Sequence, residues 1–388
     1  MSAPTRSPRF LYSTSPSSVS NSMLGAVEAA TSGRAQADIG ETAPGDFEWQ
    51  SLTDELPSQS RFTTAAWLRA WADAFLPHQQ WAPPRHYLTV RDRRARLKAI
   101  VPFAIQRRFG ISISALGGFY WPFRTPVIPD SCTVDELVVM ARALTDSGSA
   151  VAIRLGPVPE THIGMTGFNI ALEAVGWHVS GKTLGQTYEV DLPDNWEQFE
   201  HQLGKNLRTK TKYYERKLQR EGALEIECRK SSLGTSWPDT LRDLVAIEER
   251  SWQHKQGGKP RFAGAANQAF WTQVLADPQL HGMACAWIMY FNHAPVSFCF
   301  CLDSGNTRHI IANHYAEQVR NYSTGSVLYR HVFRDAVESP AIESVNIGAG
   351  DSGYKARWGA KPSFKLIDWF AFRPGAGGRL LELVNQLR

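Results

Sequence analysis

The segment HIIANHYAEQVRNYSTGSVL, residues 309–328, predicts a strand that leads through a loop into a helix beginning at Gly325 and Ser326. The first amides of a helix have no acceptor within the helix, and the helix dipole is positive at that end. Gly325 allows an anion to approach the backbone closely, and Ser326 adds a hydroxyl donor. The segment is therefore either a phosphate or pyrophosphate site, or an ordinary helix start with a glycine in the turn.

A second segment, NIGAGDSGYKARWG at 346–359, follows a predicted buried strand. It combines several glycines with an acid, a phenol and two cations, which is more polar chemistry than a connecting loop needs. Lys355 and Arg357 are suited to neutralising phosphates or a developing anion. Tyr354 can donate a proton, and Asp351 can orient or deprotonate an amine. The alternative is a structural loop in which Asp351 caps a turn, Lys355 faces solvent and Trp358 packs.

Outward from these segments, hydrophobic periodicity predicts the same order of elements twice. Each half consists of a helix, an antiparallel hairpin, a second helix and a buried strand, which indicates duplication of one α/β unit. The predicted fold class is α/β with a mixed sheet. The predicted helices are 65–75, with Thr63 or Thr64 as its N-cap, 134–147, 240–252, 267–275 and 326–337. The predicted strands are 86–90, 97–105, 111–116, 151–155, 283–290, 296–302, 308–313, 344–347 and 364–372.

The composition of residues 1–45 differs from that of the rest of the chain. These residues include few large apolar side chains and no sustained period, so burial cannot offset chain entropy and we expect a disordered leader. An N-terminal unit is expected over 46–180 and a C-terminal unit over 181–388.

The segment KNLRTKTKYYERKLQR at 205–220 holds seven basic residues and one acidic residue. Its less polar positions follow a helical spacing, so we expect a helix with one face on the body and its cations outward. Three interpretations are open: RNA binding, contact with a nucleotide-sugar or lipid phosphate acceptor, or a solvated cationic face. The residues of the packed face are Leu207, Thr211, Tyr214 and Leu218.

The charge, the cysteines and the apolar runs of the sequence bear on its partners and its compartment. A net charge of +5 over 388 residues does not by itself imply a nucleic-acid or membrane partner. The five cysteines form no C-x-x-C pair, which fits a reducing compartment, and Cys299 and Cys301 are expected to be small buried hydrophobes. The sequence has neither an apolar run long enough to span a membrane nor the apolar core of a secretory signal. We therefore expect a cytoplasmic protein without a metal.

Several short motifs resemble GNAT acetyltransferases of the CelD type, which are associated with cellulose and exopolysaccharide synthesis and are related to the FemAB peptidoglycan aminoacyltransferases. The resemblance covers about residues 47–375 and is strict only in short patches. The motifs are Tyr315-Ala316, YSTGSVL at 322–328, Gly350-Asp351-x-x-Tyr354-Lys355-x-x-Trp358, the basic segment from Asn206 to Gly222, and TAAWL at 64–68 with Trp71.

The resemblance implies tandem GNAT-like units, of which the second carries the acyl-donor groove. In that fold two parallel strands separate, and the thioester arm of the donor pairs with the exposed backbone. The corresponding strands here are 310–315 and 344–347, with the pyrophosphate on the amides around 324–326. The donor-binding residues implied by the resemblance are Ile311, Asn313, Tyr315, Thr324, Gly325, Ser326 and Arg357.

Direct acyl transfer requires a base for the attacking amine or hydroxyl and an acid for the leaving thiolate. The candidate bases are Asp351, Glu317 and His314, and Asp351 ranks first because the family motif contains it. His314 ranks below it, because the motif lacks it and strand alternation places it opposite Asn313 and Tyr315. The complete predicted catalytic set is Asp351, Tyr354, Lys355 and His314.

The expected activity is N- or O-acyl transfer from acetyl-CoA to a small molecule, a sugar or a polysaccharide precursor. The segment RNYSTGS at 320–326 departs from the usual GNAT phosphate loop, Gln/Arg-x-x-Gly-x-Gly/Ala, because it has a single glycine. A longer acyl-CoA or an aminoacyl-tRNA therefore stays open as the donor. The alternatives to this activity are a FemAB-like transferase that uses aminoacyl-tRNA and a non-catalytic accessory protein of exopolysaccharide synthesis.

Overall fold

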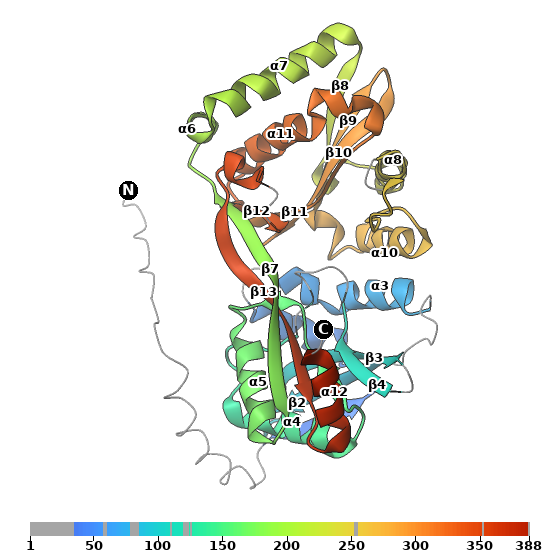
Figure 1. Cartoon of the computed structure of the whole chain (residues 1–388), viewed down its shortest axis with the longest axis vertical. Coiled ribbons are helices and arrows are strands. Elements are labelled where there is room, and N and C mark those ends of the chain that lie inside the picture. Colours follow the sequence, from blue (N-terminus) through green and yellow to red (C-terminus); the bar gives the residue numbers. More distant parts are fainter. Residues whose placement is uncertain are drawn as a thin grey trace.

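The computed structural model describes residues 35–56, 60–77, 85–108, 111–118, 124, 126–251, 255–350 and 353–386. Its strands form one continuous mixed sheet in the order β1-β2-β3-β4-β5-β13-β7-β12-β11-β10-β9-β8, and β6 pairs with β13. Helices flank this sheet in both halves of the molecule (Figure 1). The predicted α/β class with a mixed sheet is confirmed.

The bounds of the elements follow the predicted segments in most places. The strands are β1 Gln36–Gly40, β2 Arg85–Arg91, β3 Leu97–Arg108, β4 Ile111–Leu116, β5 Ala152–Arg154, β6 Val158–Pro159, β7 His178–Asp191, β8 Leu224–Lys230, β9 Ala284–Phe291, β10 Ala294–Ser304, β11 Thr307–Tyr315, β12 Ser344–Ala349 and β13 Lys361–Phe372. The helices are α2 Asp46–Asp54, α3 Ala65–Phe75, α4 Val134–Ser147, α5 Ile163–Ala174, α6 Trp196–Gln202, α7 Lys205–Glu221, α8 Trp237–Glu249, α10 Ala265–Ala276, α11 Thr324–Glu338 and α12 Ala376–Gln386.

The two halves of the chain repeat one topology. In the N-terminal half, β2, β3 and β4 form an antiparallel meander, α4 follows, and β5 returns parallel to β4. In the C-terminal half, β9, β10, β11, α11 and β12 are connected in the same way. This repetition is the duplicated α/β unit that the order of elements predicts.

Two long antiparallel strands, β7 and β13, join the halves (Figure 1). One end of β13 pairs with β5, and one end of β7 pairs with β12. The expected boundary between residues 180 and 181 therefore falls inside β7. Because the strands continue from one half into the other, the halves share a backbone hydrogen-bond ladder.

The expectation of a disordered leader is wrong for residues 36–40. They form β1, which pairs antiparallel with β2. Ala37 and Ile39 alternate with polar residues and pack against the core of the N-terminal half, which is enough to hold a short edge strand. Residues 1–34 lie outside the described part of the chain.

One hydrophobic core extends across both halves, and α3 packs on α10 within it. The ring of Trp67 lies edge-on to that of Phe270, with 5.1 Å between centroids. Of the two candidate caps Thr63 and Thr64, Thr64 caps α3, because its hydroxyl accepts a hydrogen bond from the amide of Trp67. Helix α3 of the N-terminal half therefore packs against α10, one of the helices that cover the sheet in the C-terminal half.

Helix α7 confirms the predicted basic helix. Thr211 and Leu218 are buried, and Leu207 and Tyr214 pack against the same core. All five cysteines carry free thiols, and Cys299 and Cys301 are buried as expected. Among the described residues, none of the helices has the length and apolar content needed to cross a membrane.

Candidate functional site

The parallel strands β11 and β12 separate partway along their length. They pair at Thr307 with Ser344, at Arg308 with Val345 and at His309 with Asn346. Beyond these pairs β11 continues to Tyr315 and β12 to Ala349, and the register between them, in this fully described stretch, extends no further. Diverging strands present backbone donors and acceptors toward the gap between them, and an extended ligand can pair with such groups.

A β-bulge lies in β11 where the gap begins. Phe300 of β10 pairs with Ala312, and Cys301 pairs with Ile310, so Ile311 is the extra residue. A bulge bends its strand and increases the local twist. The bulge follows the last β11–β12 pair, His309 with Asn346, so Ile311, a predicted donor-binding residue, lies next to the point of divergence.

Helix α11 begins beside the end of β11 and has no side-chain cap. Its preceding residue, Ser323, has a left-handed backbone with φ of 48°, and its carbonyl accepts from the amides of Ser326 and Val327 at 2.9 and 3.1 Å. The amide of Ser326 is thus already engaged. By position, the amides of Thr324 and Gly325 are those without an acceptor within α11.

Asn313 of β11 holds the first turn of α11. Its Nδ2 donates to the carbonyl oxygen of Gly325 at 3.1 Å. A Cβ atom at residue 325 would lie 2.8 Å from Asn313 Oδ1, so glycine is needed for this close approach. Asn313 Oδ1 and Thr324 Oγ1 are buried and have no hydrogen-bond partner among the described residues. The predicted donor-binding residues Asn313 and Gly325 are thus in contact. The two buried oxygen atoms beside this contact are available to accept or share a hydrogen bond with a ligand.

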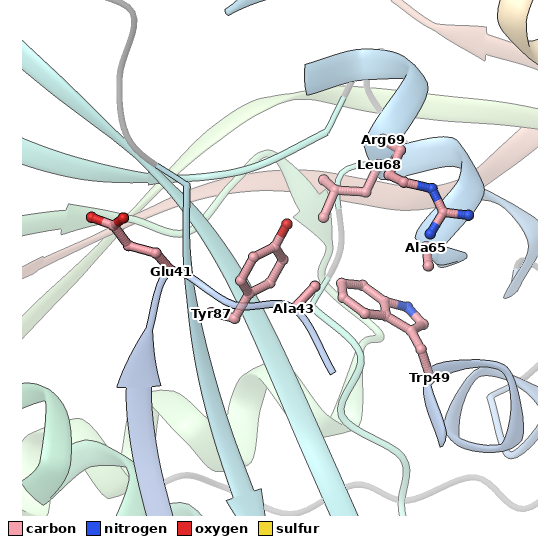
Figure 2. Close-up of a pocket in the computed structure, with 7 residues that line it drawn as sticks. All are labelled: Glu41, Ala43, Trp49, Ala65, Leu68, Arg69 and Tyr87. Carbon is pink, nitrogen blue, oxygen red and sulfur yellow. The ribbon is translucent and has the colours of Figure 1, made fainter. Parts of the chain in front are cut away.

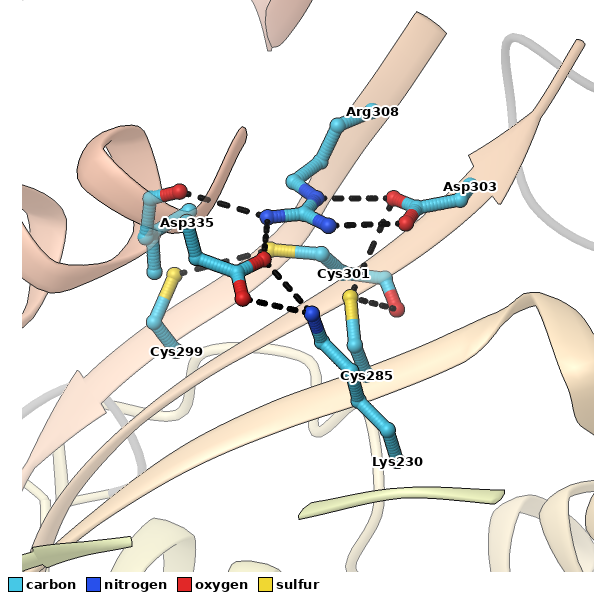
Figure 3. A network of polar contacts seen from close by, with 8 residues as sticks. Lys230, Cys285, Cys299, Cys301, Asp303, Arg308 and Asp335 are labelled. Carbon is cyan, nitrogen blue, oxygen red and sulfur yellow. Dashed lines mark hydrogen bonds and ion pairs between the residues drawn. The ribbon is translucent and has the colours of Figure 1, made fainter. Parts of the chain in front are cut away.

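A buried ion network fixes α11 to β11 on the paired side of the gap (Figure 3). The guanidinium of Arg308, 1% exposed, contacts Asp303 at 2.8 Å and Asp335 of α11 at 2.7 Å. Lys230 of β8 donates to both carboxylate oxygens of Asp335, at 2.6 and 2.7 Å. Because these charges pair across three strands and a helix, they set the position of α11 relative to the gap.

Strand alternation separates the polar residues at the end of β11 onto two faces. Asn313 contacts the start of α11, and Tyr315 packs in the core on that side. His314 lies on the other face, where its ring stacks on Phe298 at 5.4 Å between centroids. The prediction that His314 and the pair Asn313 and Tyr315 occupy opposite faces is confirmed.

Lys355 is buried, contrary to either simple interpretation of its loop. Its Nζ donates to the carbonyl oxygens of Gly348 and Ala349, at 2.7 and 2.9 Å, and lies 5.1 Å from the ring centre of Tyr188. The ammonium therefore holds the end of β12, one wall of the gap, in place. Arg357, two residues further, is exposed.

Tyr354 faces Tyr329 of α11, with 3.4 Å between the two hydroxyl oxygens. Burial raises the pKa of Tyr329, and partial burial raises that of Tyr354, which is 36% exposed, so both retain their protons at neutral pH. The adjacent Trp358 is buried and stacks on Phe333, with 5.1 Å between ring centroids. Asp351, the first-ranked base of the sequence analysis, lies outside the described residues.

Glu248 of α8 is a charged residue of the site that the sequence analysis missed. It is 1% exposed, and its Oε1 lies 3.8 Å from Nε2 of His314. A carboxylate in the apolar row of α8, seven residues after Leu241 and four after Leu244, was the signal that could have revealed it. The described residues contain no cluster of three His, Cys, Asp or Glu side chains that could hold a metal ion.

A cavity of about 370 Å³ lies in the N-terminal half, beside α3 (Figure 2). Figure 2 shows Glu41 and Arg69 on opposite sides of Tyr87. Arg69 is paired with Asp46 at 2.6 Å. None of the predicted site residues lines this cavity, so the diverging strands and the cavity are two separate features.

Comparison with known proteins finds one matching family model. Residues 205–356, from α7 to the loop after β12, match the family model described as acetyltransferase (GNAT) domain. No curated protein matches the chain.

Two solved structures resemble the whole described fold. FemX has a TM-score of 0.58 at 11% identity, over 89% of this chain and 99% of that chain. The C-terminal domain (DUF2156) of a candidate lysylphosphatidylglycerol synthetase from Agrobacterium fabrum has a TM-score of 0.52 at 13% identity, over 87% of this chain and 93% of that one. At such identities the likeness shows the fold alone, which is a GNAT fold in a FemX-like arrangement.

Proposed function

We propose that this protein is an acyl-CoA-dependent N- or O-acyltransferase whose donor lies between β11 and β12. The observation that carries the proposal is the divergence of these parallel strands directly beside the uncapped start of α11. An extended thioester arm can pair with the strand edges, while a pyrophosphate can accept from the helix amides.

The donor-binding residues are assigned on this basis. Ile311 lies at the bulge, Asn313 fixes the helix turn, and the amides of Thr324 and Gly325 receive the pyrophosphate. We keep acetyl-CoA as the expected donor. The remaining assigned contacts are those of Tyr315, Ser326 and Arg357.

The catalytic roles follow from where the side chains lie. Tyr354 retains its proton at neutral pH, so it can protonate the leaving thiolate. Lys355 supports the reaction by fixing the end of β12. Asp351 and His314 are the candidates for the base. The acceptor is an amine or hydroxyl of a small molecule, a sugar or a polysaccharide precursor in the cytoplasm, in keeping with the CelD-type resemblance.

Isothermal titration with CoA and acetyl-CoA tests the proposal. We expect saturable binding with one donor per chain, and turnover of acetyl-CoA once an acceptor is supplied from a panel of amines and sugars. An absence of binding at millimolar donor would overturn the proposal. Donor binding without turnover of any acyl-CoA would instead favour the non-catalytic accessory protein.

An aminoacyl-tRNA-dependent transferase is the second candidate, and the outer face of α7 favours it. Lys205, Thr209, Tyr213, Arg216 and Arg220 recur every three or four residues and are all exposed, so they form one stripe along the helix. Among the described residues, the three cations of this α7 stripe have no carboxylate within ion-pair distance. A row of cations with an exposed aromatic ring is suited to a polyanion.

Fluorescence anisotropy with tRNA distinguishes the two candidates. The triple variant Lys205→Gln, Arg216→Gln and Arg220→Gln would weaken tRNA binding and flatten its salt dependence if α7 binds RNA. A control with the same change in charge, Lys182→Gln, Lys361→Gln and Arg379→Gln, would leave it unchanged. Equal tRNA binding by the α7 variant and the control would remove this candidate.

A further inference from the structure

We propose that His314 is the general base of the acyl transfer and that Glu248 is its positioning residue. The two side chains lie on the face of β11 opposite α11. This inference rests on the proposed acyltransferase function and adds to it a base, the residue that orients the base, and the side from which the acceptor enters.

The carboxylate of Glu248 is held rigidly. Its Oε1 accepts from the amide of Arg261 at 2.7 Å, and its Oε2 accepts from the amides of Phe262 and Ala263 at 2.9 and 2.7 Å. Three backbone donors stabilise the ionised form and prevent rotation of the group. The carboxylate fixed in this way faces the ring of His314 with its Oε1.

The ring of His314 is oriented from two sides. It stacks on Phe298, and its Nε2 faces Oε1 of Glu248 at 3.8 Å. This separation is too long for a hydrogen bond but well within the range of charge–charge attraction in a buried site. With Nε2 facing the carboxylate, Nδ1 is the nitrogen left to accept a proton from an acceptor.

The two faces of β11 present different groups to the two substrates. The face with α11 offers the helix amides and the Asn313–Gly325 contact, which are suited to the phosphates of the donor. The other face offers His314, and α8 and α10 cover it. A thioester arm that passes between β11 and β12 reaches this second face, so the acceptor meets the acyl carbon there.

The proposed step is balanced within these groups. The nitrogen or oxygen of the acceptor forms a bond to the acyl carbon while its proton passes to Nδ1 of His314. The carbon–sulfur bond breaks, and the thiolate takes its proton from the hydroxyl of Tyr354. The imidazolium then releases its proton to solvent, which restores the proton of Tyr354. Glu248 transfers no proton and stabilises the imidazolium while it exists.

Two charged groups face His314 from the elements packed around it: Glu248 from α8, and Arg261 from the segment that Glu248 holds. Burial lowers the pKa of His314 below its usual 6.5, Glu248 raises it, and Arg261 lowers it further. The imidazole is therefore neutral, as a base must be, down to a pH below 6.5. Removing either neighbouring charge moves the pKa in a known direction.

Titration of His314 by NMR in the whole protein tests the geometry without any assay of activity. Glu248→Gln would lower the pKa of His314, and Arg261→Gln would raise it, each by about half a unit or more. His314→Gln assigns the resonance, and the exposed His178 supplies the control resonance. Arg261→Gln keeps the test decisive if Glu248→Gln fails to fold. A His314 pKa that neither variant moves would overturn the pairing.

The pH dependence of kcat/KM tests the chemical role. The acidic limb would shift to lower pH in Glu248→Gln and to higher pH in Arg261→Gln, following the NMR values, and His314→Gln would lower kcat by about 10²-fold or more with donor affinity kept. An acidic limb that does not shift in either variant, or full activity in His314→Gln, would contradict the role of His314. If the unaltered protein does not bind CoA, the proposed function itself is contradicted, so the two failures are distinguishable.

Discussion

The side chain of Asn313 and the backbone of Gly325 are in direct contact, with 3.1 Å between Asn313 Nδ2 and the Gly325 carbonyl oxygen. The contact ties the end of β11 to the first turn of α11. It also explains the single glycine of the 320–326 segment, because the glycine makes room for Asn313.

Replacing Gly325 by alanine tests this contact. The added Cβ would lie 2.8 Å from Asn313 Oδ1, so either the Asn313 amide must leave its hydrogen bond or the helix start must move. We expect a loss of stability of about 1–3 kcal/mol, measured by urea unfolding, and donor affinity lower by about tenfold or more. Gly282→Ala is the matched control, because its Cβ would have no neighbour within 4 Å. Adding Asn313→Ser to Gly325→Ala would recover part of the stability; a double variant that recovers none would argue against the clash.

Lys355→Met tests the assignment of this lysine as a support for β12. The change leaves the carbonyls of Gly348 and Ala349 without their buried donor, which costs about 1–3 kcal/mol of unfolding free energy. Weaker donor binding should accompany this loss, since the wall of the gap moves. Lys361→Met, at an exposed lysine, should do neither. A stable Lys355→Met protein that loses only kcat would show instead that the ammonium acts in the chemistry.

Tyr354→Phe tests the proposed acid. We expect kcat to fall by about 10²-fold or more while CoA affinity stays the same, with Tyr213→Phe on the exposed face of α7 as control. Because burial raises the pKa of Tyr354, the unaltered enzyme should lose activity from this group only at a pH above 10. An alkaline limb below pH 10 that disappears in Tyr354→Phe would mean that the phenol is easier to deprotonate than its burial implies.

Arg308→Met tests the buried network that holds α11. It would leave Asp303 and Asp335 without their shared partner, so we expect a loss of about 3–5 kcal/mol in urea unfolding. Burial raises the pKa of Asp335, but Arg308 and Lys230 lower it more, so it lies below the usual 3.8. The stability that this carboxylate contributes is therefore present above pH 3.8 and lost as the pH falls through the lower folded-state value. Arg334→Met removes an exposed i,i+4 pair and should be nearly neutral; equal effects of the two variants would contradict the structural role of Arg308.

Hydrophobic spacing predicted the regular elements well where one face of an element is buried. Helix α4 has the predicted bounds, and the burial of Cys299 and Cys301 is as expected. Strand β7 was not predicted, because its sequence HVSGKTLGQTYEVD is polar and contains two glycines, and its strand structure depends on pairing with β12 and β13. Propensity carries no information on such long-range pairing.

The candidate site was predictable in its location but not in the roles of its side chains. The helix start and the strand before it come from adjacent sequence, so their proximity followed from the order of elements. The burial of Lys355 depends on its contact with the carbonyl groups at the end of β12. The pairing of His314 with Glu248 joins residues 66 positions apart on different elements, as their numbers show. Contacts of both kinds depend on tertiary structure, which a single sequence does not display.

Hydrogen–deuterium exchange measured with and without CoA tests the central claim most directly, because it locates the donor on the chain. The account predicts slower exchange on CoA binding in peptides covering residues 310–315, 324–327 and 346–350, and no change in the corresponding strands β4 and β5 of the N-terminal half. Protection that appears at β4 and β5 instead, or CoA binding that leaves the peptides of β11, α11 and β12 unchanged, would contradict it.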